Sequence, residues 1–289
     1  PRIEQVLVNL FANALDAMRE APPPRRLAVA VLRAGERIEI RVQDSGPGIP
    51  AEVLPRLFEP FFTTKDFGSG IGLATCFAPL HECCHRTAFR SRHVNDAVAW
   101  FAGLLSFYNS TYYRRYHQWH HRYTHQAGLD PELEDPVPTT PWTYLLEVSG
   151  WHWWSGKLSG YGSLLWGDLS DRAYLSPESI PQVRRSVRLQ FLVYGALLLA
   201  SLIGGNGFLW WSWLLPLAVG QPFLRLLLLA EHSGCSFGTD GTTNTRTTLT
   251  IAPVRWLMWN MPFHAEHHLY PSLPFHALPA AHRWTAPHL

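Results

Sequence analysis

Histidines at helical spacing constrain this 289-residue chain more than any other feature. His81 and His85 lie four residues apart, and the pattern His-x-x-His-His occurs twice, at residues 117–121 and 264–268. Residues three and four apart share one face of an α-helix, so each cluster can direct its rings toward one point. Neutral imidazole binds iron, copper, nickel and zinc. Three such clusters therefore predict a metal centre built on helices.

The number of ligands indicates the kind of centre. A structural zinc site closes with about four ligands and usually includes thiolate. Eight clustered histidines are more ligands than one such site needs, so a two-metal site that handles oxygen is the better fit. Cys83 and Cys84 are adjacent, and adjacent helical residues point about 100° apart, so both cannot face a metal shared by His81 and His85. We expect the cysteines to be free thiols.

The three histidine clusters and their flanks resemble the histidine boxes of the membrane fatty acid desaturases, a superfamily that includes the alkane hydroxylases. The matching flanks are His81 to Phe89, Asp130-Pro131-Glu132, and Trp259 to Pro271. The resemblance covers roughly residue 77 to the C-terminus. It implies a mainly α-helical membrane domain that uses two iron ions, O2 and an external electron donor.

The resemblance also implies individual roles for residues of this chain. His232, in Glu231-His232-Ser233-Gly234, resembles the isolated ligand histidine of the alkane hydroxylases. We expect Glu82, Glu231, Glu266 and His125 to orient ligand rings without binding metal. The expected metal ligands are His81, His85, His117, His120, His121, His232, His264, His267 and His268.

Two apolar segments, residues 189–203 and 208–230, predict one transmembrane hairpin. Arg184, Arg185 and Arg188 precede the pair, and Arg246 and Arg255 follow it. The positive-inside rule places both outer ends, and with them all the histidine boxes, on the cytoplasmic side. A buried soluble hairpin is the alternative. Relatives normally have a pair of membrane helices before the first histidine box, and residues 77–289 are expected to lack it.

Residues 1–76 predict a different kind of structure. Residues 3–18 have the periodicity of an amphipathic helix. Residues 27–33 and 37–43 alternate apolar and polar side chains around Ala34-Gly35, as a β-hairpin does. Two glycine-rich stretches follow, at residues 44–50 and 67–73, and such glycines let the backbone approach phosphates closely.

The order of these motifs resembles the ATP-binding domain of sensor histidine kinases. The matching boxes lie around Asn9 and Asn13, at Asp44, Gly46 and Gly48, at Phe58 to Phe62, and at Gly70 and Gly72. The resemblance implies Asn13 near Mg²⁺, Asp44 on the adenine amino group, and Gly70 and Gly72 at the phosphates of Mg-ATP. After Leu73 the chain passes directly to the first histidine box, so we expect this α/β domain to be truncated.

Composition separates the same two regions. All fifteen histidines and all thirteen tryptophans lie after residue 80. A net charge of +2 with no basic stripe gives no support to a nucleic-acid partner. The sequence predicts a truncated α/β ATPase-like fragment at 1–76, followed by a desaturase-like domain at 77–289.

The function that these features favour is O2-dependent desaturation of a long acyl chain in lipid metabolism. Hydroxylation is a variant of that reaction. The substrate would be a membrane lipid or acyl chain, and a separate electron-transfer protein would supply electrons. The alternatives are an ATP-binding component of a sensor histidine kinase, or a non-functional chimeric reading frame of two incomplete pieces.

Overall fold

The structure is a computed structural model, and it describes residues 10–11, 14–15, 17–18, 22–35, 37–48, 71–134 and 138–289. The chain forms two compact units, residues 1–66 and 67–289. The predicted helix at 3–18 lies largely outside the described residues. The fold is mainly α-helical, with a small β-hairpin in the first unit, as the sequence predicts.

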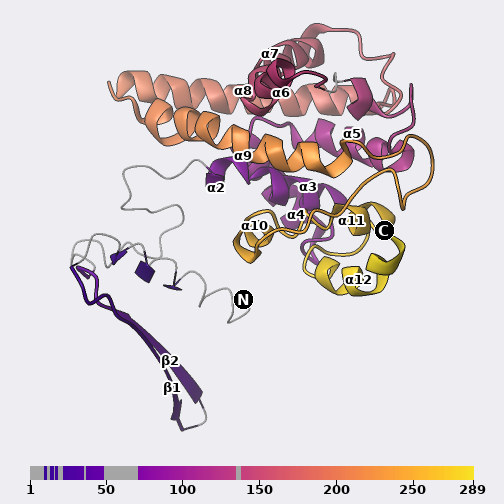
Figure 1. The fold of residues 1–289 in the computed structure, drawn as a ribbon. Coiled ribbons are helices and arrows are strands. Elements are labelled where there is room, and N and C mark those ends of the chain that lie inside the picture. Colours follow the sequence, from indigo (N-terminus) through magenta and orange to yellow (C-terminus); the bar gives the residue numbers. More distant parts are fainter. Residues whose placement is uncertain are drawn as a thin grey trace. The chain divides into compact units, whose positions relative to one another are not determined.

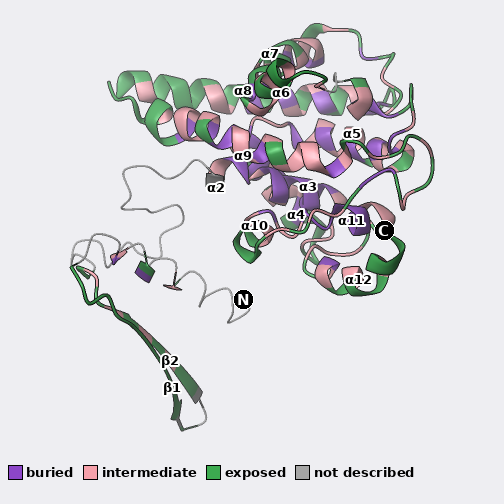
Figure 2. Cartoon of the chain, viewed as in Figure 1, coloured by how far each residue is buried: buried purple, intermediate pink, exposed green. Residues whose placement is uncertain are grey.

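The hairpin of the first unit consists of β1 (Leu27–Ala34) and β2 (Arg37–Asp44). The strands are antiparallel, with Leu27 opposite Asp44 and Val31 opposite Ile40. This confirms the hairpin predicted from the alternating pattern. Val31 and Ile38 are 66% and 73% exposed, and the hairpin is coloured mostly as exposed in Figure 2. Its apolar side chains therefore contribute little to a core.

The second unit is a bundle of helices (Figure 1). Its N-terminal half contains the first two histidine boxes, and its C-terminal half contains the membrane candidates and the third box. In chain order its elements are α2 (Ile71–Ala74), α3 (Phe77–His85), α4 (Arg92–Leu105), α5 (Ser110–Tyr123), η2 (Pro131–Glu134), α6 (Pro141–Val148), α7 (Trp151–Trp166), α8 (Ser179–Ile203), η3 (Trp210–Leu214), α9 (Leu215–His232), α10 (Ala252–Leu257), α11 (His264–Leu269), α12 (Leu278–Thr285) and η4 (Ala286–His288).

One carboxylate aligns the helices that carry the first two boxes. Asp96 on α4 accepts hydrogen bonds from Arg86, just after α3, and from Arg114 on α5. Arg114 also donates from Nε to the carbonyl oxygen of Cys84, at 3.1 Å. A carboxylate that accepts from two guanidinium groups makes strong, directional bonds. These bonds fix the C-terminal end of α3 against α4 and α5.

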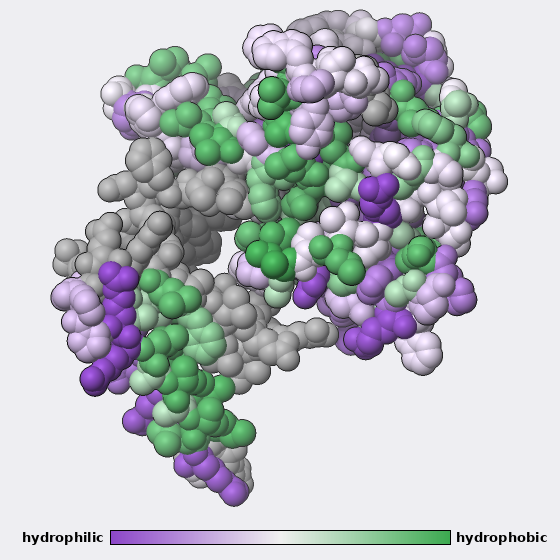
Figure 3. Space-filling model, viewed as in Figure 1, coloured by the Kyte–Doolittle hydropathy of each residue, from purple (hydrophilic) through white to green (hydrophobic). Residues whose placement is uncertain are grey.

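The two membrane candidates differ slightly from their predicted bounds. The first helix, α8, begins at Ser179 rather than at 189, so its polar flank lengthens it to 25 residues. The second runs from Trp210 to His232, with a π-helical segment, η3, ahead of Pro216. Both helices are long and apolar enough to cross a membrane. Much of α8 is exposed (Figure 2), and hydrophobic residues gather at the end of the hairpin where α8 connects to the second span (Figure 3).

The hydrophobic core of the second unit surrounds the helix that carries the first box. Leu80, Cys83 and Cys84 of α3 are essentially inaccessible, and they pack with Leu217 and Leu224 of α9. Gly103 near the end of α4 has a structural role, because a Cβ there would lie 2.6 Å from the carbonyl oxygen of Tyr108. Glycine at this position lets the backbone of Tyr108, just before α5, pack against the end of α4.

Candidate metal centre

Nine histidines that the sequence singled out come from four elements of the second unit. The first box lies on α3 and the second on α5. His232 is the last residue of α9, because that helix continues two residues beyond the predicted span. The third box forms the short helix α11. Each helix places its histidines on one face through three- and four-residue spacing.

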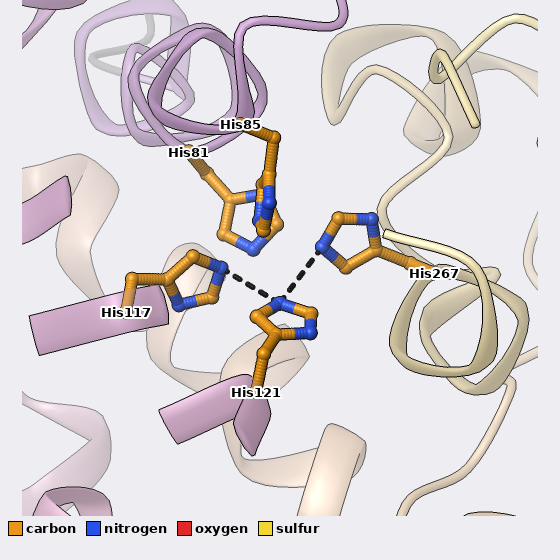
Figure 4. A group of neighbouring side chains, drawn as sticks. All are labelled: His81, His85, His117, His121 and His267. Carbon is orange, nitrogen blue, oxygen red and sulfur yellow. Dashed lines mark hydrogen bonds between the residues drawn. The ribbon is translucent and has the colours of Figure 1, made fainter. Parts of the chain in front are cut away.

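Five of these histidines form a first group, shown in Figure 4. One ring nitrogen from each lies within 4.8 Å of those of the other four. Nε2 of His121 is 3.0 Å from Nε2 of His117 and 3.1 Å from Nε2 of His267. One N–H of His121 cannot be donated to both of these nitrogens. The first group consists of His81, His85, His117, His121 and His267.

His120, His232 and His268 form a second group, again with ring nitrogens within 4.8 Å of one another. His264 lies beside it, with its Nε2 3.1 Å from Nε2 of His232. The two groups adjoin, because the ring of His121 stacks on that of His268 at a centroid distance of 4.0 Å. The structure thus brings all nine histidines into one region.

Unpaired buried nitrogens show that the donor set fits metal ions. Both ring nitrogens of His81 and the Nε2 atoms of His85 and His268 are buried without a hydrogen-bond partner in the described residues. His117, His121 and His264 have an unpaired Nδ1, whereas their Nε2 atoms lie 3.0–3.1 Å from another histidine. Buried polar atoms are normally paired, and a bound ion is one standard explanation when they are not. An all-imidazole donor set suits iron, copper, nickel or zinc.

The cysteines stand apart from this centre. All four lie in the described part of the chain and are unpaired, as expected. The Sγ of Cys84 faces the carbonyl oxygen of Ser110 at 3.8 Å, and neither Cys83 nor Cys84 belongs to a histidine group. Burial raises the pKa of both thiols to about 12, which keeps them protonated and poor ligands.

Burial also keeps most of the histidines neutral. It lowers the pKa of His85 to about 4, with the charges of His120 and Arg114 adding to the effect. Burial and neighbouring histidines hold the pKa of other rings well below its ordinary value. Because only neutral imidazole binds metal, this environment favours a ligand set over a charged cluster. The rings affected in this way are His81, His117, His121, His264, His267 and His268.

His120 is the exception among these rings. Burial opposes its charged form, but Glu132 and Asp130 together raise its pKa. Its Nδ1 is 2.9 Å from Oδ1 of Asp130, and its Nε2 is 3.5 Å from a carboxylate oxygen of Glu132. The bond to Asp130 fixes the ring so that Nε2 faces the second group.

Two further rings of the second group are oriented in the same way. Nδ1 of His232 is 3.2 Å from the carbonyl oxygen of Asn244, and Nδ1 of His268 is 3.0 Å from Oγ1 of Thr124. These contacts leave the opposite nitrogen of each ring for the group. The sequence patterns assigned no role to Asp130, Asn244 or Thr124. Only Asp130 gave a signal, because it belongs to a segment that resembles the desaturases.

The residues expected to orient ligand rings have more varied partners. Glu82 accepts hydrogen bonds from Thr87 Oγ1, at 2.6 Å, and from the Phe275 amide, at 3.0 Å. It follows His81 directly, so it points about 100° away from that ring. Glu82 therefore connects α3 to the segment after the third box. Its carboxyl pKa is raised by burial.

Glu266 likewise turns away from the ligand rings, because it lies between them on α11. It binds Nδ1 of His282 at 2.6 Å and the hydroxyl groups of Thr285 and Thr247. Glu231 remains near a ligand ring, with Oε2 3.6 Å from Nε2 of His264.

His125 lies outside both groups, although it is close to one ligand. Its Nδ1 is 3.0 Å from the carbonyl oxygen of Ser236, and its ring centroid is 5.2 Å from that of His232. Its backbone N–H donates to Oδ2 of Asp130, at 2.8 Å. His125 therefore packs behind the second group.

The predicted nucleotide-binding residues are divided between the two units, and three of them lie outside the described residues. Asp44 ends β2, and its Oδ1 accepts the amide hydrogen of Gly46 at 2.8 Å, within its own turn. Gly48 has a φ of +77°, a left-handed conformation that suits glycine. Gly72 lies on α2, in the second unit. Asn9, Asn13 and Gly70 lie outside the described residues.

Two family models match the chain. The model described as "Fatty acid desaturase" matches residues 67–289, which include every histidine of both groups. The model described as "Histidine kinase-, DNA gyrase B-, and HSP90-like ATPase" matches residues 1–101. The two matches overlap at the first histidine box.

Similar curated proteins match a quarter of the chain. "Sensor protein FixL" of Bradyrhizobium diazoefficiens is 47% identical over 73 residues, which are 25% of this chain and 14% of that protein. "C4-dicarboxylate transport sensor protein DctB" of Pseudomonas aeruginosa is 46% identical over 77 residues, 26% of this chain and 13% of that protein. "Sensory histidine kinase/phosphatase NtrB" of Rhizobium leguminosarum is 38% identical over 86 residues, 25% and 22% of the two chains. The chain thus spans less than a quarter of the length of these relatives.

Proposed function

Because the chain belongs to the fatty acid desaturase family, we propose that its second unit is an O2-dependent oxidoreductase that desaturates a long acyl chain with two iron ions. The observation that carries this proposal is the convergence of five buried ring nitrogens within 4.8 Å, beside a second group of three. A membrane lipid or other acyl chain is the substrate, and a separate electron-transfer protein is the reductant.

The two groups divide the metal ligands between them. His81, His85, His117, His121 and His267 hold one iron. His120, His232 and His268, with His264 beside them, hold the other. When bound, such a pair of irons supplies O2-dependent oxidation of unactivated C–H bonds.

The residues of the chain prepare the centre for this chemistry. Burial keeps most of the imidazoles neutral, and Asp130, Thr124 and the Asn244 carbonyl group fix the orientation of three rings. A cavity of about 730 Å³ reaches His81, His117 and His264, and aromatic side chains such as Phe77 and Tyr113 form part of its walls. A pocket of that size can hold much of an acyl chain.

Lipid profiling tests the reaction. Cells that express the chain should contain unsaturated acyl chains that cells expressing His267→Ala lack. His93→Ala, which changes an exposed histidine outside both groups, is the matched control and should behave like the unchanged protein. Hydroxylated chains in place of double bonds would identify the hydroxylase variant. Identical lipid profiles for the unchanged protein and His267→Ala would contradict the proposal.

We further propose that α8 and the helix ending at His232 anchor the unit in the cytoplasmic membrane, with the metal centre on the cytoplasmic side. Arg184, Arg185 and Arg188 lie near the start of α8, and Arg246 and Arg255 follow the second span. This distribution supports a cytoplasmic location for both outer ends. Labelling of a cysteine introduced at Gly205, between the spans, with a membrane-impermeant reagent should occur from outside the cell. Labelling only after lysis would contradict this topology.

The first unit supports a second candidate function, the binding of Mg-ATP. Its similarity to sensor kinases, 46–47% identical over the aligned residues in two of them, favours this candidate. Calorimetric titration of the full chain with Mg-ATP tests it, and Asp44→Ala should abolish saturable binding. Glu39→Ala, on the same strand, is the control and should leave binding unchanged. Heat changes that are equal for the unchanged protein and Asp44→Ala would argue against an adenine site at Asp44.

A further inference from the structure

The cavity that reaches the histidines also contains basic and hydroxyl groups that metal binding does not need. Tyr108, Lys157 and Arg225 line it together with His81 and His117. They come from three places: the turn before α5, helix α7 and helix α9. Pockets that bind small molecules are mostly apolar, with a few polar groups that fix the orientation of the ligand. These three side chains have that character.

Arg225 is an unusual residue for its helix. It lies in the apolar segment Leu224 to Leu229 of a helix long enough to cross a membrane. An arginine in such a segment is energetically costly and usually faces the protein interior or a substrate path. Its Nη2 donates to Oη of Tyr108 at 3.3 Å, and its buried Nε has no hydrogen-bond partner. Among the described residues, no carboxylate forms an ion pair with it.

Tyr108 also has an unused donor. Its oxygen accepts one hydrogen bond from Trp153 Nε1, at 2.9 Å, and one from Arg225. Both of these bonds use the oxygen as acceptor. The O–H hydrogen itself has no acceptor in the described part of the chain. The ammonium nitrogen of Lys157 lies 3.2 Å from the centre of the Tyr108 ring. The guanidinium group of Arg225 and a hydroxyl hydrogen without an acceptor among the described residues therefore lie together on the cavity wall.

The cavity also has acidic side chains, namely Glu132, Glu134, Glu147, Asp171 and Glu231. Two of them contact the histidines. Glu132 approaches Nε2 of His120, and Glu231 approaches Nε2 of His264. Tyr108 is separated from His81 by a single ring, that of Phe77, whose centroid is 5.2 Å from Tyr108 and 5.9 Å from His81. The cavity thus has a donor-rich region that the width of an aromatic ring separates from the metal ligands.

We propose that Arg225 and Tyr108 bind the free carboxylate of a fatty acid whose chain extends along the cavity past His81 and His117. Charge-assisted hydrogen bonds from a guanidinium group and a hydroxyl group match a carboxylate, and no such match exists for a methyl ester or an alkane. The assignment deepens the proposed function, on which it rests for the oxidation itself. It names the substrate as an unesterified fatty acid.

Equilibrium binding to the metal-free, detergent-solubilised full chain tests the assignment. Radiolabelled dodecanoate is the probe, and methyl dodecanoate and dodecyl phosphate are the competitors. Dodecanoate should bind at least roughly tenfold more tightly than its methyl ester, as a buried charged hydrogen bond implies. It should also bind more tightly than dodecyl phosphate. Because no iron is needed, this result is independent of whether the chain oxidises lipids.

Variants assign the preference to these side chains. Arg225→Met and Tyr108→Phe should each remove most of the preference for the acid over the ester. Arg188→Met, the same substitution at an exposed position of α8, should keep it. Tyr108→Phe removes only one oxygen, so it carries the test if Arg225→Met does not fold.

Three results would overturn the proposal. The first is equal binding of acid and ester by the unchanged protein, and the second is a full preference in the folded Tyr108→Phe variant. The third is tighter binding of dodecyl phosphate than of dodecanoate, which would assign the site to a phosphate group instead.

Discussion

The two units of the chain carry motifs of similar clarity in sequence but differ in what surrounds those motifs. In residues 67–289, ring nitrogens from α3, α5, α9 and α11 meet in a buried region. In the described portion of residues 1–66, Asp44 bonds within its own turn, and apolar side chains such as Ile38 face solvent. In the second unit, the site therefore depends on the packing of four elements that are distant in sequence.

The largest expected effect in this comparison comes from His121→Ala. His121 contacts His117 and His267 in the first group and stacks on His268 of the second. Its loss should remove bound iron from at least one group and lower activity by more than about 100-fold, since even residues behind a ligand typically affect metal affinity by 10- to 100-fold. Iron-to-protein ratios from elemental analysis measure this.

His276→Ala is the control for that experiment, because His276 is exposed and belongs to neither group. It should retain full iron content. If His121→Ala also retained two irons per chain, the convergence in the second unit would not be a metal centre, and the contrast between the units would disappear.

A smaller effect is expected from Asp130→Asn. Asp130 fixes Nδ1 of His120 and also accepts the backbone N–H of His125. Loss of its charge should weaken metal binding at the second group by roughly 10- to 100-fold while leaving the first group occupied. Titration with a competing chelator measures the two affinities. Asp168→Asn, an exposed carboxylate, should change neither, and equal weakening of both sites would show that the groups do not act separately.

The next effect in size is that of pH: lowering it should destabilise residues 77–85 of the second unit but not the hairpin of the first. Burial lowers the pKa of His85 to about 4, below the value of about 6.5 in an unfolded chain. The unfolded state therefore takes up a proton first, so the stability present above about pH 6.5 falls as the pH decreases toward 4. Hydrogen exchange of the metal-free protein, corrected for intrinsic rates, should show lost protection in residues 77–85 between pH 7 and 5.

Residues 27–44 contain no histidine and should show unchanged protection over the same range. His85→Gln should reduce the pH dependence in residues 77–85. Equal loss of protection in both segments would mean that the histidines are not its cause.

The smallest effect is expected in the hairpin. Val31 is 66% exposed, so Val31→Ala should change the free energy of unfolding by less than about 0.5 kcal/mol. The same change at Val183, which is completely buried on α8, should cost about 1–3 kcal/mol. Thermal unfolding in detergent compares them. A large loss from Val31→Ala would show that the hairpin packs against a surface that its exposure does not reveal.

Local patterns predicted the local features of the fold well. The hairpin followed from alternation at residues 27–43, and the helical positions of the histidines followed from their spacing. The division of the rings into five and three could not be predicted, because it depends on how α5 faces α3 and α11. His120 and His121 are neighbours in sequence, yet they belong to different groups, since adjacent helical residues point in different directions.

The residues that orient the ligand rings were harder to predict for the same reason. Glu82 and Glu266 sit beside ligands in sequence, and this adjacency turns them away from those ligands in space. Asp130 lies ten residues from His120 and reaches it only because the chain turns back after α5. The carbonyl group of Asn244 has no side-chain signature at all.

The hydrogen bond between Glu82 and the amide of Phe275 spans 193 positions of the chain. During synthesis, the helix with the first box leaves the ribosome long before its partner exists. The pocket of imidazoles can therefore close only when nearly the whole second unit has been translated, and a metal ion held by all four elements would enter at that late stage.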